Sequence, residues 1–144
     1  MFRKVVLSAT AAVFLSTAIL PANANGINIE QFGFGHVAGG NQNGFNNLIG
    51  IFQDGHANET INNQFGNHNT TAIGQTGAHN FADTWQNGFG NSAGVGQFGT
   101  DHNAVMTQDG NGNIAAGVQV GHGCDASVNQ AGSGNVAAFV QTCP

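Results

Sequence analysis

The chain has 144 residues, and only Arg3 and Lys4 are basic, against seven Asp and Glu residues, for a formal net charge of −5. Recognition of nucleic acids needs many cations to neutralise phosphates, so we expect no nucleic-acid partner. Glycine supplies 23 residues, and no apolar spacing of three and four recurs, so no helix is expected beyond the first segment.

Residues 1–24 have the pattern of a secretory signal peptide. Arg3 and Lys4 precede a mostly apolar run over 5–20, and Ala22-Asn23-Ala24 forms a small-residue cleavage signal. The alternative is a membrane anchor, but Ser and Thr residues interrupt the run, which is also short for a span. We therefore expect cleavage after Ala24 and an oxidising environment outside the cell.

An 11-residue repeat, present ten times, fills most of residues 25–144, and a fixed period of this kind indicates a repeat architecture. Every glutamine of the chain occupies one place of this repeat: Gln31, Gln42, Gln53, Gln64, Gln75, Gln86, Gln97, Gln108, Gln119, Gln130 and Gln141. Glycine takes the second place after each of the first ten: Gly33, Gly44, Gly55, Gly66, Gly77, Gly88, Gly99, Gly110, Gly121 and Gly132. The fifth place is mostly asparagine, at Asn47, Asn58, Asn69, Asn80, Asn91, Asn113 and Asn135. The seventh place is mostly alanine, so the unit reads Q-x-G-x-x-N-x-A-x-x-x.

From the fifth place to the next glutamine, residues alternate between two faces, which is the periodicity of a β-strand. In residues 91–97, Asn91, Ala93, Val95 and Gln97 share one face. The Gly-rich segment from each glutamine to the fifth place predicts a turn, with the second-place glycines in it. Each unit is therefore one strand and one turn. Residues 25–31 show the same alternation and add one strand before the ten repeats, which makes eleven strands.

A strand this short cannot bury its apolar face alone, so the units must stack. Two strands per coil of 22 residues predict an all-β fold, a narrow β-solenoid of cross-β type with strand-turn-strand coils. Identical glutamine and asparagine amides would then lie above one another and donate hydrogen bonds along ladders. A disordered low-complexity chain is the alternative, but disorder does not require glutamine in one phase.

The repeated Gln-x-Gly-x-x-Asn-x-Ala pattern behind a signal sequence resembles the curlin repeat of bacterial curli subunits, over all of residues 25–144. The sequence departs from that pattern at the fifth place in His36, His102 and Cys124. The resemblance implies an extracellular functional amyloid, a pilus-like surface fibre of the biofilm matrix that mediates adhesion. It also implies self-polymerisation, a nucleator or major-subunit homologue as partner, and export through a dedicated outer-membrane apparatus. The glutamine lattice and fifth-place asparagines would form the fibre core.

Two further sets of residues carry possible chemistry near the turns. Five of the six histidines are expected along one edge of the solenoid, where they could bind Zn²⁺ or Cu²⁺ or could simply be tolerated in turns: His36, His56, His79, His102 and His122. Cys124 and Cys143 are expected one coil apart at the same edge, within reach of a disulfide. An intermolecular bond, free thiols or a metal site with His122 are the alternatives.

No enzymatic activity and no cofactor are expected. The seven carboxylates are scattered over five places of the repeat, and a thin solenoid offers no pocket in which to desolvate a pair of acids. An end without a capping element exposes a row of strand N–H and C=O groups, which favours end-to-end polymerisation. The alternative function is a soluble β-solenoid that binds a surface, or a metal through its turn histidines.

Overall fold

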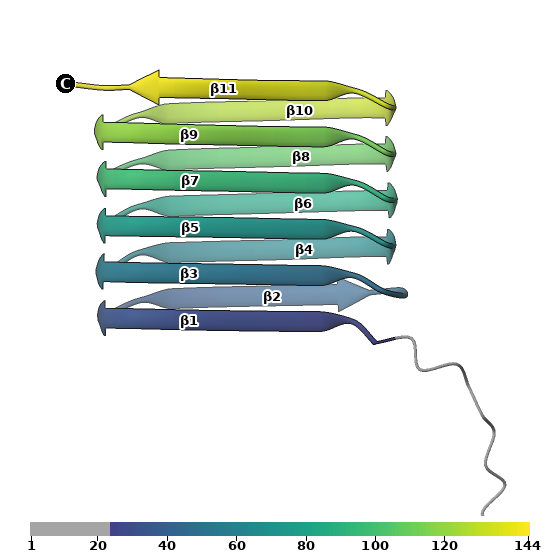
Figure 1. Ribbon diagram of the computed structural model, residues 1–144, viewed down its shortest axis with the longest axis horizontal. Coiled ribbons are helices and arrows are strands. Elements are labelled where there is room, and N and C mark those ends of the chain that lie inside the picture. Colours follow the sequence, from purple (N-terminus) through teal and green to yellow (C-terminus); the bar gives the residue numbers. More distant parts are fainter. Residues whose placement is uncertain (1–23) are drawn as a thin grey trace, which may run out of the picture.

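The computed structural model describes residues 24–144, and almost all of the expected signal peptide lies outside this range. The described residues form eleven strands. These strands are stacked in two parallel sheets, as Figure 1 shows. The strands are β1 (Gly26–Phe34), β2 (Val37–Asn43), β3 (Leu48–His56), β4 (Glu59–Asn67), β5 (Thr70–Ala78), β6 (Phe81–Phe89), β7 (Ser92–Thr100), β8 (Asn103–Asn111), β9 (Ile114–His122), β10 (Asp125–Ser133) and β11 (Val136–Thr142). Within 24–144, no helix is long and apolar enough to cross a membrane.

The six odd-numbered strands form one sheet, here the odd sheet, and the five even-numbered strands form the other, here the even sheet. Every pairing is parallel and joins residues 22 positions apart, so that Gln53 pairs with Gln75 and Gln75 with Gln97. One coil therefore contains 22 residues in two strands. The predicted all-β solenoid with eleven strands is confirmed.

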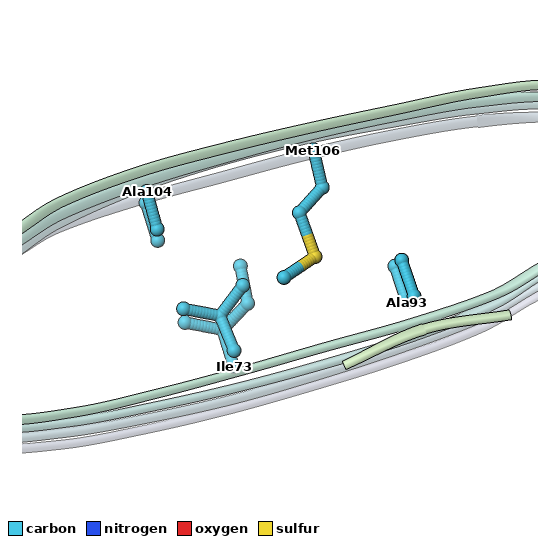
Figure 2. Packing of buried hydrophobic residues seen from close by; sticks show 7 residues of the cluster. Ile73, Ala93, Ala104 and Met106 are labelled. Atoms are coloured by element: carbon cyan, nitrogen blue, oxygen red, sulfur yellow. The ribbon is translucent and has the colours of Figure 1, made fainter. Parts of the chain in front are cut away.

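The space between the two sheets is filled by a thin apolar core. Figure 2 shows Ile73 and Ala93 pointing inward from the odd sheet toward Ala104 and Met106 of the even sheet. These residues occupy the seventh and ninth places of the repeat, which alternate with outward-facing places along each strand. Small alanines at the seventh place keep the sheets close, and the ninth place supplies most of the apolar volume.

The strands extend further than the sequence predicts, and the turns are correspondingly shorter. Nine of the ten second-place glycines lie within strands near their ends; only Gly44 lies outside, after β2. Most turns consist of two residues, such as Gly90 and Asn91 between β6 and β7. The first of these two residues always has a left-handed φ, even where it is not glycine, as at Ala57 (φ 49°). The expected turn from glutamine to the fifth place is therefore wrong in its extent.

Candidate functional site

The glutamines form two continuous columns inside the solenoid, one on each sheet. In the odd sheet, each Nε2 donates to the Oε1 of the glutamine one coil later, from Gln31 to Gln141, at 2.7–3.0 Å. In the even sheet, the column from Gln42 to Gln130 repeats this contact at 2.8–2.9 Å. All donors point toward the later strands, so each column has a direction.

The glutamines also join the two sheets, a contact that sequence reasoning missed. From Gln42 onward, each Nε2 donates its other hydrogen to a backbone carbonyl at the start of the preceding strand. For example, Gln75 of β5 contacts the Glu59 carbonyl of β4 at 3.0 Å. One amide therefore satisfies a coil-to-coil contact and a sheet-to-sheet contact, which explains why a full-length amide is needed at this place.

The fifth-place asparagines bind the backbone rather than one another. The backbone N–H of Asn91 donates to Oδ1 of Asn69 at 3.0 Å, and Nδ2 of Asn69 donates to the carbonyl of Gly88 at 3.1 Å. The same pair of contacts recurs at Asn47 and Asn113. Only two of these side chains donate to another asparagine side chain in residues 24–144, from Asn80 and from Asn135. The expected amide-to-amide asparagine ladder is therefore replaced by side chains that cap the turn of the next coil.

The second-place glycines mark the closest approach between successive coils. At Gly77 the φ angle is 123°, and a Cβ there would overlap the carbonyl oxygen of Gly99, one coil later. Gly88 stands in the same relation to Gly110. Positive φ and the missing side chain are both required, so this place excludes every other residue type without movement of the backbone.

The contacts of the glutamines, the fifth-place asparagines and the second-place glycines recur along the solenoid. These residues are also the ones that characterise a known repeat. The family model described as curlin associated repeat matches residues 78–110, from the end of β5 through β6 and β7 to β8. Residues 78–110 are therefore similar to the curlin associated repeat. No match to the chain was found among curated proteins. The same contacts continue on both sides of the matched residues, because the glutamine columns begin at Gln31 and end at Gln141.

Two histidines substitute for asparagine at the fifth place of the 11-residue repeat. The Nδ1 of His36 accepts a hydrogen bond from the Asn58 backbone N–H at 3.2 Å, and the Nδ1 of His102 accepts one from Cys124 at 3.1 Å. The imidazole of His102 is only 1% exposed, and its Nε2 contacts the Phe98 carbonyl at 3.3 Å. An imidazole therefore reproduces the acceptor and donor of the asparagine amide. His102 is therefore a buried structural residue and is not simply tolerated in its turn.

The remaining histidines of the expected column lie at or next to strand ends along one edge of the solenoid: His56, His79 and His122. Asp101 lies 3.3 Å from His122 and 3.9 Å from His79. Among residues 24–144, no group of three or more His, Cys, Asp or Glu side chains is placed to hold a metal ion. Metal binding by these histidines stays a prediction from sequence.

Cys124 and Cys143 form a disulfide near the last coil, with their Cα atoms 5.6 Å apart. Cys124 takes the fifth place, where the other repeats of the chain have asparagine or histidine, and it is buried. The bond closes a loop with a sequence separation of 19 and ties the end of β11 to the turn between β9 and β10. A covalent bond thus replaces the hydrogen bonds that an asparagine would make at this edge.

The two outer faces of the solenoid differ in charge and in side-chain size. The even sheet carries four outward carboxylates, at Glu59, Asp83, Asp109 and Asp125. On the odd sheet a groove of about 800 Å³ runs across the strands, and its floor is formed largely by small residues: Gly50, Ala72, Gly74, Gly94, Gly96 and Ala116. From β5 to β11 the odd sheet carries no outward carboxylate.

Asp83 is the one carboxylate whose pKa is clearly shifted among residues 24–144. Burial raises its pKa above the usual 3.8, and its Oδ1 has no hydrogen-bond partner within the described part of the chain. In the even sheet it stands between Ile61 and Val105 of the adjacent strands. The ionised form is therefore disfavoured by lost hydration.

The Asp83→Asn variant should be more stable than wild type at neutral pH. A folded-state pKa above the unfolded value means that the protonated side chain supports folding below the unfolded pKa, and this support is lost as pH rises through the folded pKa. The uncharged asparagine avoids this loss, so the urea midpoint of the variant should lie above that of wild type at pH 7. The difference between the two midpoints should vanish below about pH 4, where Asp83 is protonated. Asp54→Asn, which removes an exposed carboxylate, is the matched control. Equal shifts in both variants would show that net charge, rather than burial, is responsible.

Proposed function

We propose that this chain is the structural subunit of an extracellular amyloid fibre of the curli type, which acts in cell adhesion, aggregation and the biofilm matrix. The observation that carries the proposal is the pair of open ends of the solenoid. β1 and β2 have strand neighbours on one side only, as do β10 and β11 at the other end. Such edges bind further strands through their free N–H and C=O groups.

The interior supports polymerisation because its hydrogen-bond pattern is the same from coil to coil and can continue past either end. The glutamine columns and the 22-residue register pass unchanged through every coil of residues 24–144. A second copy placed on either end continues the same hydrogen bonds, as in the stacked ladders of cross-β fibres. Natural edge strands are usually protected by Lys, Pro or bulges. Neither edge strand at either end contains Lys or Pro.

The partners follow from this role. The subunit binds copies of itself, a nucleator or major-subunit homologue starts the fibre, and a dedicated outer-membrane apparatus exports the chain. The expected signal peptide supports secretion. The carboxylates are spread over both outer faces, and the buried glutamines and fifth-place asparagines are occupied in structural hydrogen bonds, which favours a structural role over catalysis.

X-ray fibre diffraction tests the proposal. Residues 25–144 are purified unfolded, diluted from denaturant and left to assemble. We expect fibres with a sharp meridional reflection at about 4.8 Å and an equatorial one at about 10 Å. A chain that stays monomeric while its circular dichroism shows folded β-sheet would contradict it.

A soluble binding solenoid is the second candidate, and the groove on the odd sheet is the observation that favours it. Its floor of glycine and alanine leaves room for an apolar ligand against the sheet. If the chain stays monomeric in the assembly experiment, a ligand should be sought first in this groove and along the edge that carries His56, His79 and His122.

A further inference from the structure

The described part of the chain contains an odd number of strands, although a coil needs two. Six strands lie in the odd sheet and five in the even sheet. At the C-terminal end, β11 therefore stands half a coil beyond β10, and at the other end β1 stands half a coil before β2 (Figure 1). Both ends of the solenoid are steps, and the two steps must fit each other if copies join end to end.

We propose that successive subunits in the fibre are related by a half turn about the fibre axis, so that β1 of the next copy adds to β10 and β2 of the next copy adds to β11. The inference rests on the proposed end-to-end fibre and adds how each copy docks. The odd sheet of one subunit is then continuous with the even sheet of the next. The occupant of each open end is a second copy of this chain.

Docking without rotation leaves a strand missing. If β1 of the next copy added to β11, then β2 of that copy would lie two strand spacings beyond β10 in the even sheet. The facing N–H and C=O groups of β10 and of that β2 would be too far apart to bond. Unmade backbone hydrogen bonds in an otherwise closed sheet are costly, because each buried group loses its water without gaining a partner. The half turn fills both sheets without a gap.

The glutamine columns end in complementary groups that fit the half turn. At the C-terminal end, Nε2 of Gln130 donates to the Ile114 carbonyl, and Nε2 of Gln141 donates to the Asp125 carbonyl. Each of these amides retains one further hydrogen, because a side-chain amide has two.

At the N-terminal end, the column-starting glutamines Gln31 and Gln42 donate to the next coil, so each Oε1 faces outward as an acceptor. Half-turn docking places Gln31 of the next copy on Gln130 and Gln42 of the next copy on Gln141. Two donors meet two acceptors, and both columns continue. Docking without rotation would place Gln31 on Gln141 and leave the free hydrogen of Gln130 without a partner.

Side-chain volume at the ninth place favours the same arrangement. Phe139, half-buried in β11, lies over Gly117, where a Cβ would overlap its ring. In half-turn docking, the residue that follows Phe139 in this inner column is Gly40 of the next copy, so the ring is flanked by glycines on both sides. Without rotation, that neighbour would be Ile29. A large residue between two small ones fills the core without overlap, whereas Ile29 against Phe139 crowds it.

Disulfide trapping within assembled fibres distinguishes the two arrangements. In the double variant Asn41→Cys/Val140→Cys, half-turn docking places the two outward-facing thiols side by side on adjacent strands of two copies. The matched variant Glu30→Cys/Val140→Cys makes the same juxtaposition in docking without rotation. All three positions are exposed, and Val140 is 75% exposed. Adjacent strands are about 4.8 Å apart, within the Cα separation of disulfides. In both double variants the two introduced thiols of one copy lie at opposite ends of the solenoid, so they cannot pair within that copy.

Fibres are oxidised mildly and separated on a denaturing gel without reductant. We expect a ladder of covalent oligomers from Asn41→Cys/Val140→Cys and several-fold less from Glu30→Cys/Val140→Cys, with each single variant giving no ladder. The reverse result would overturn the half turn but preserve end-to-end assembly. Fibres that give no ladder with either double variant would contradict both docking arrangements. Absence of fibres would contradict the proposed function itself.

Diffraction from wild-type fibres gives an independent check. Eleven strands make five and a half coils, so half-turn docking predicts a rise of about 26 Å per subunit and a true repeat of about 53 Å over two subunits. Docking without rotation needs six coils per subunit and predicts a single repeat of about 29 Å. A 29 Å repeat without the doubled one would overturn the proposal.

Discussion

Replacing Gly77 with alanine should prevent stable folding of the solenoid and assembly of fibres. The new Cβ would overlap the carbonyl oxygen of Gly99 in the next coil, and the φ angle of 123° is one that side chains rarely adopt. Relief requires separation of two paired strands in the middle of the stack, where the hydrogen bonds of β5 and β7 would be lost. We expect a loss of about 3 kcal/mol or more in the free energy of unfolding.

Gly74→Ala in the same strand is the matched control. A Cβ at Gly74 meets nothing within 4 Å, and its backbone needs no positive φ. The free energy of unfolding should therefore be unchanged or rise by about 0.5 kcal/mol, because alanine restricts the unfolded chain. The measurements are the urea midpoint and the lag before fibres grow. If both variants assembled like wild type, close approach at the second place would not be what requires glycine.

The register could be predicted from the sequence because one residue type marks every coil. All glutamines share one place of the repeat, and stacking identical amides fixes which residues pair. The turns could not be predicted as well, because glycine is compatible with both a strand end and a turn. The left-handed turn residue is glycine in some repeats but Asn46, His68 or Asp101 in others, so its identity gives no consistent signal.

The hydrogen bond from each glutamine to a backbone carbonyl of the other sheet could not be predicted from the sequence either. A period shows which residues lie above one another, but it does not show which backbone carbonyl faces an amide across the core. That Gln86 donates to the Thr70 carbonyl depends on the separation of the sheets, which the small seventh-place residues set. The burial of His102 could have been predicted, since it occupies the place of a buried asparagine in the repeat.

Replacing Gln75 with leucine should destabilise the subunit by about 3 kcal/mol, although the two side chains have similar volumes. Gln75 is fully buried, accepts from Gln53 at 2.8 Å and donates to Gln97 at 2.8 Å. Its Nε2 also contacts the Glu59 and Asn80 carbonyls, at 3.0 and 3.1 Å. Leucine would leave the Oε1 of Gln97 without its donor in a site that water does not reach. The measurement is the urea midpoint of the freshly folded chain.

Gln31→Leu should separate the stability of the subunit from the growth of the fibre. Gln31 is exposed at the N-terminal end, and its side chain donates one hydrogen bond, to Gln53 at 2.7 Å. Its loss should lower the free energy of unfolding by only about 0.5–1 kcal/mol. In the proposed fibre, however, Gln31 would lie at the junction between copies and supply an acceptor to the preceding subunit, so elongation should slow markedly. Equal losses of stability in the two leucine variants would mean that strand preference, rather than the buried amide column, sets the cost. Unchanged elongation with Gln31→Leu would mean that the column does not continue across the junction.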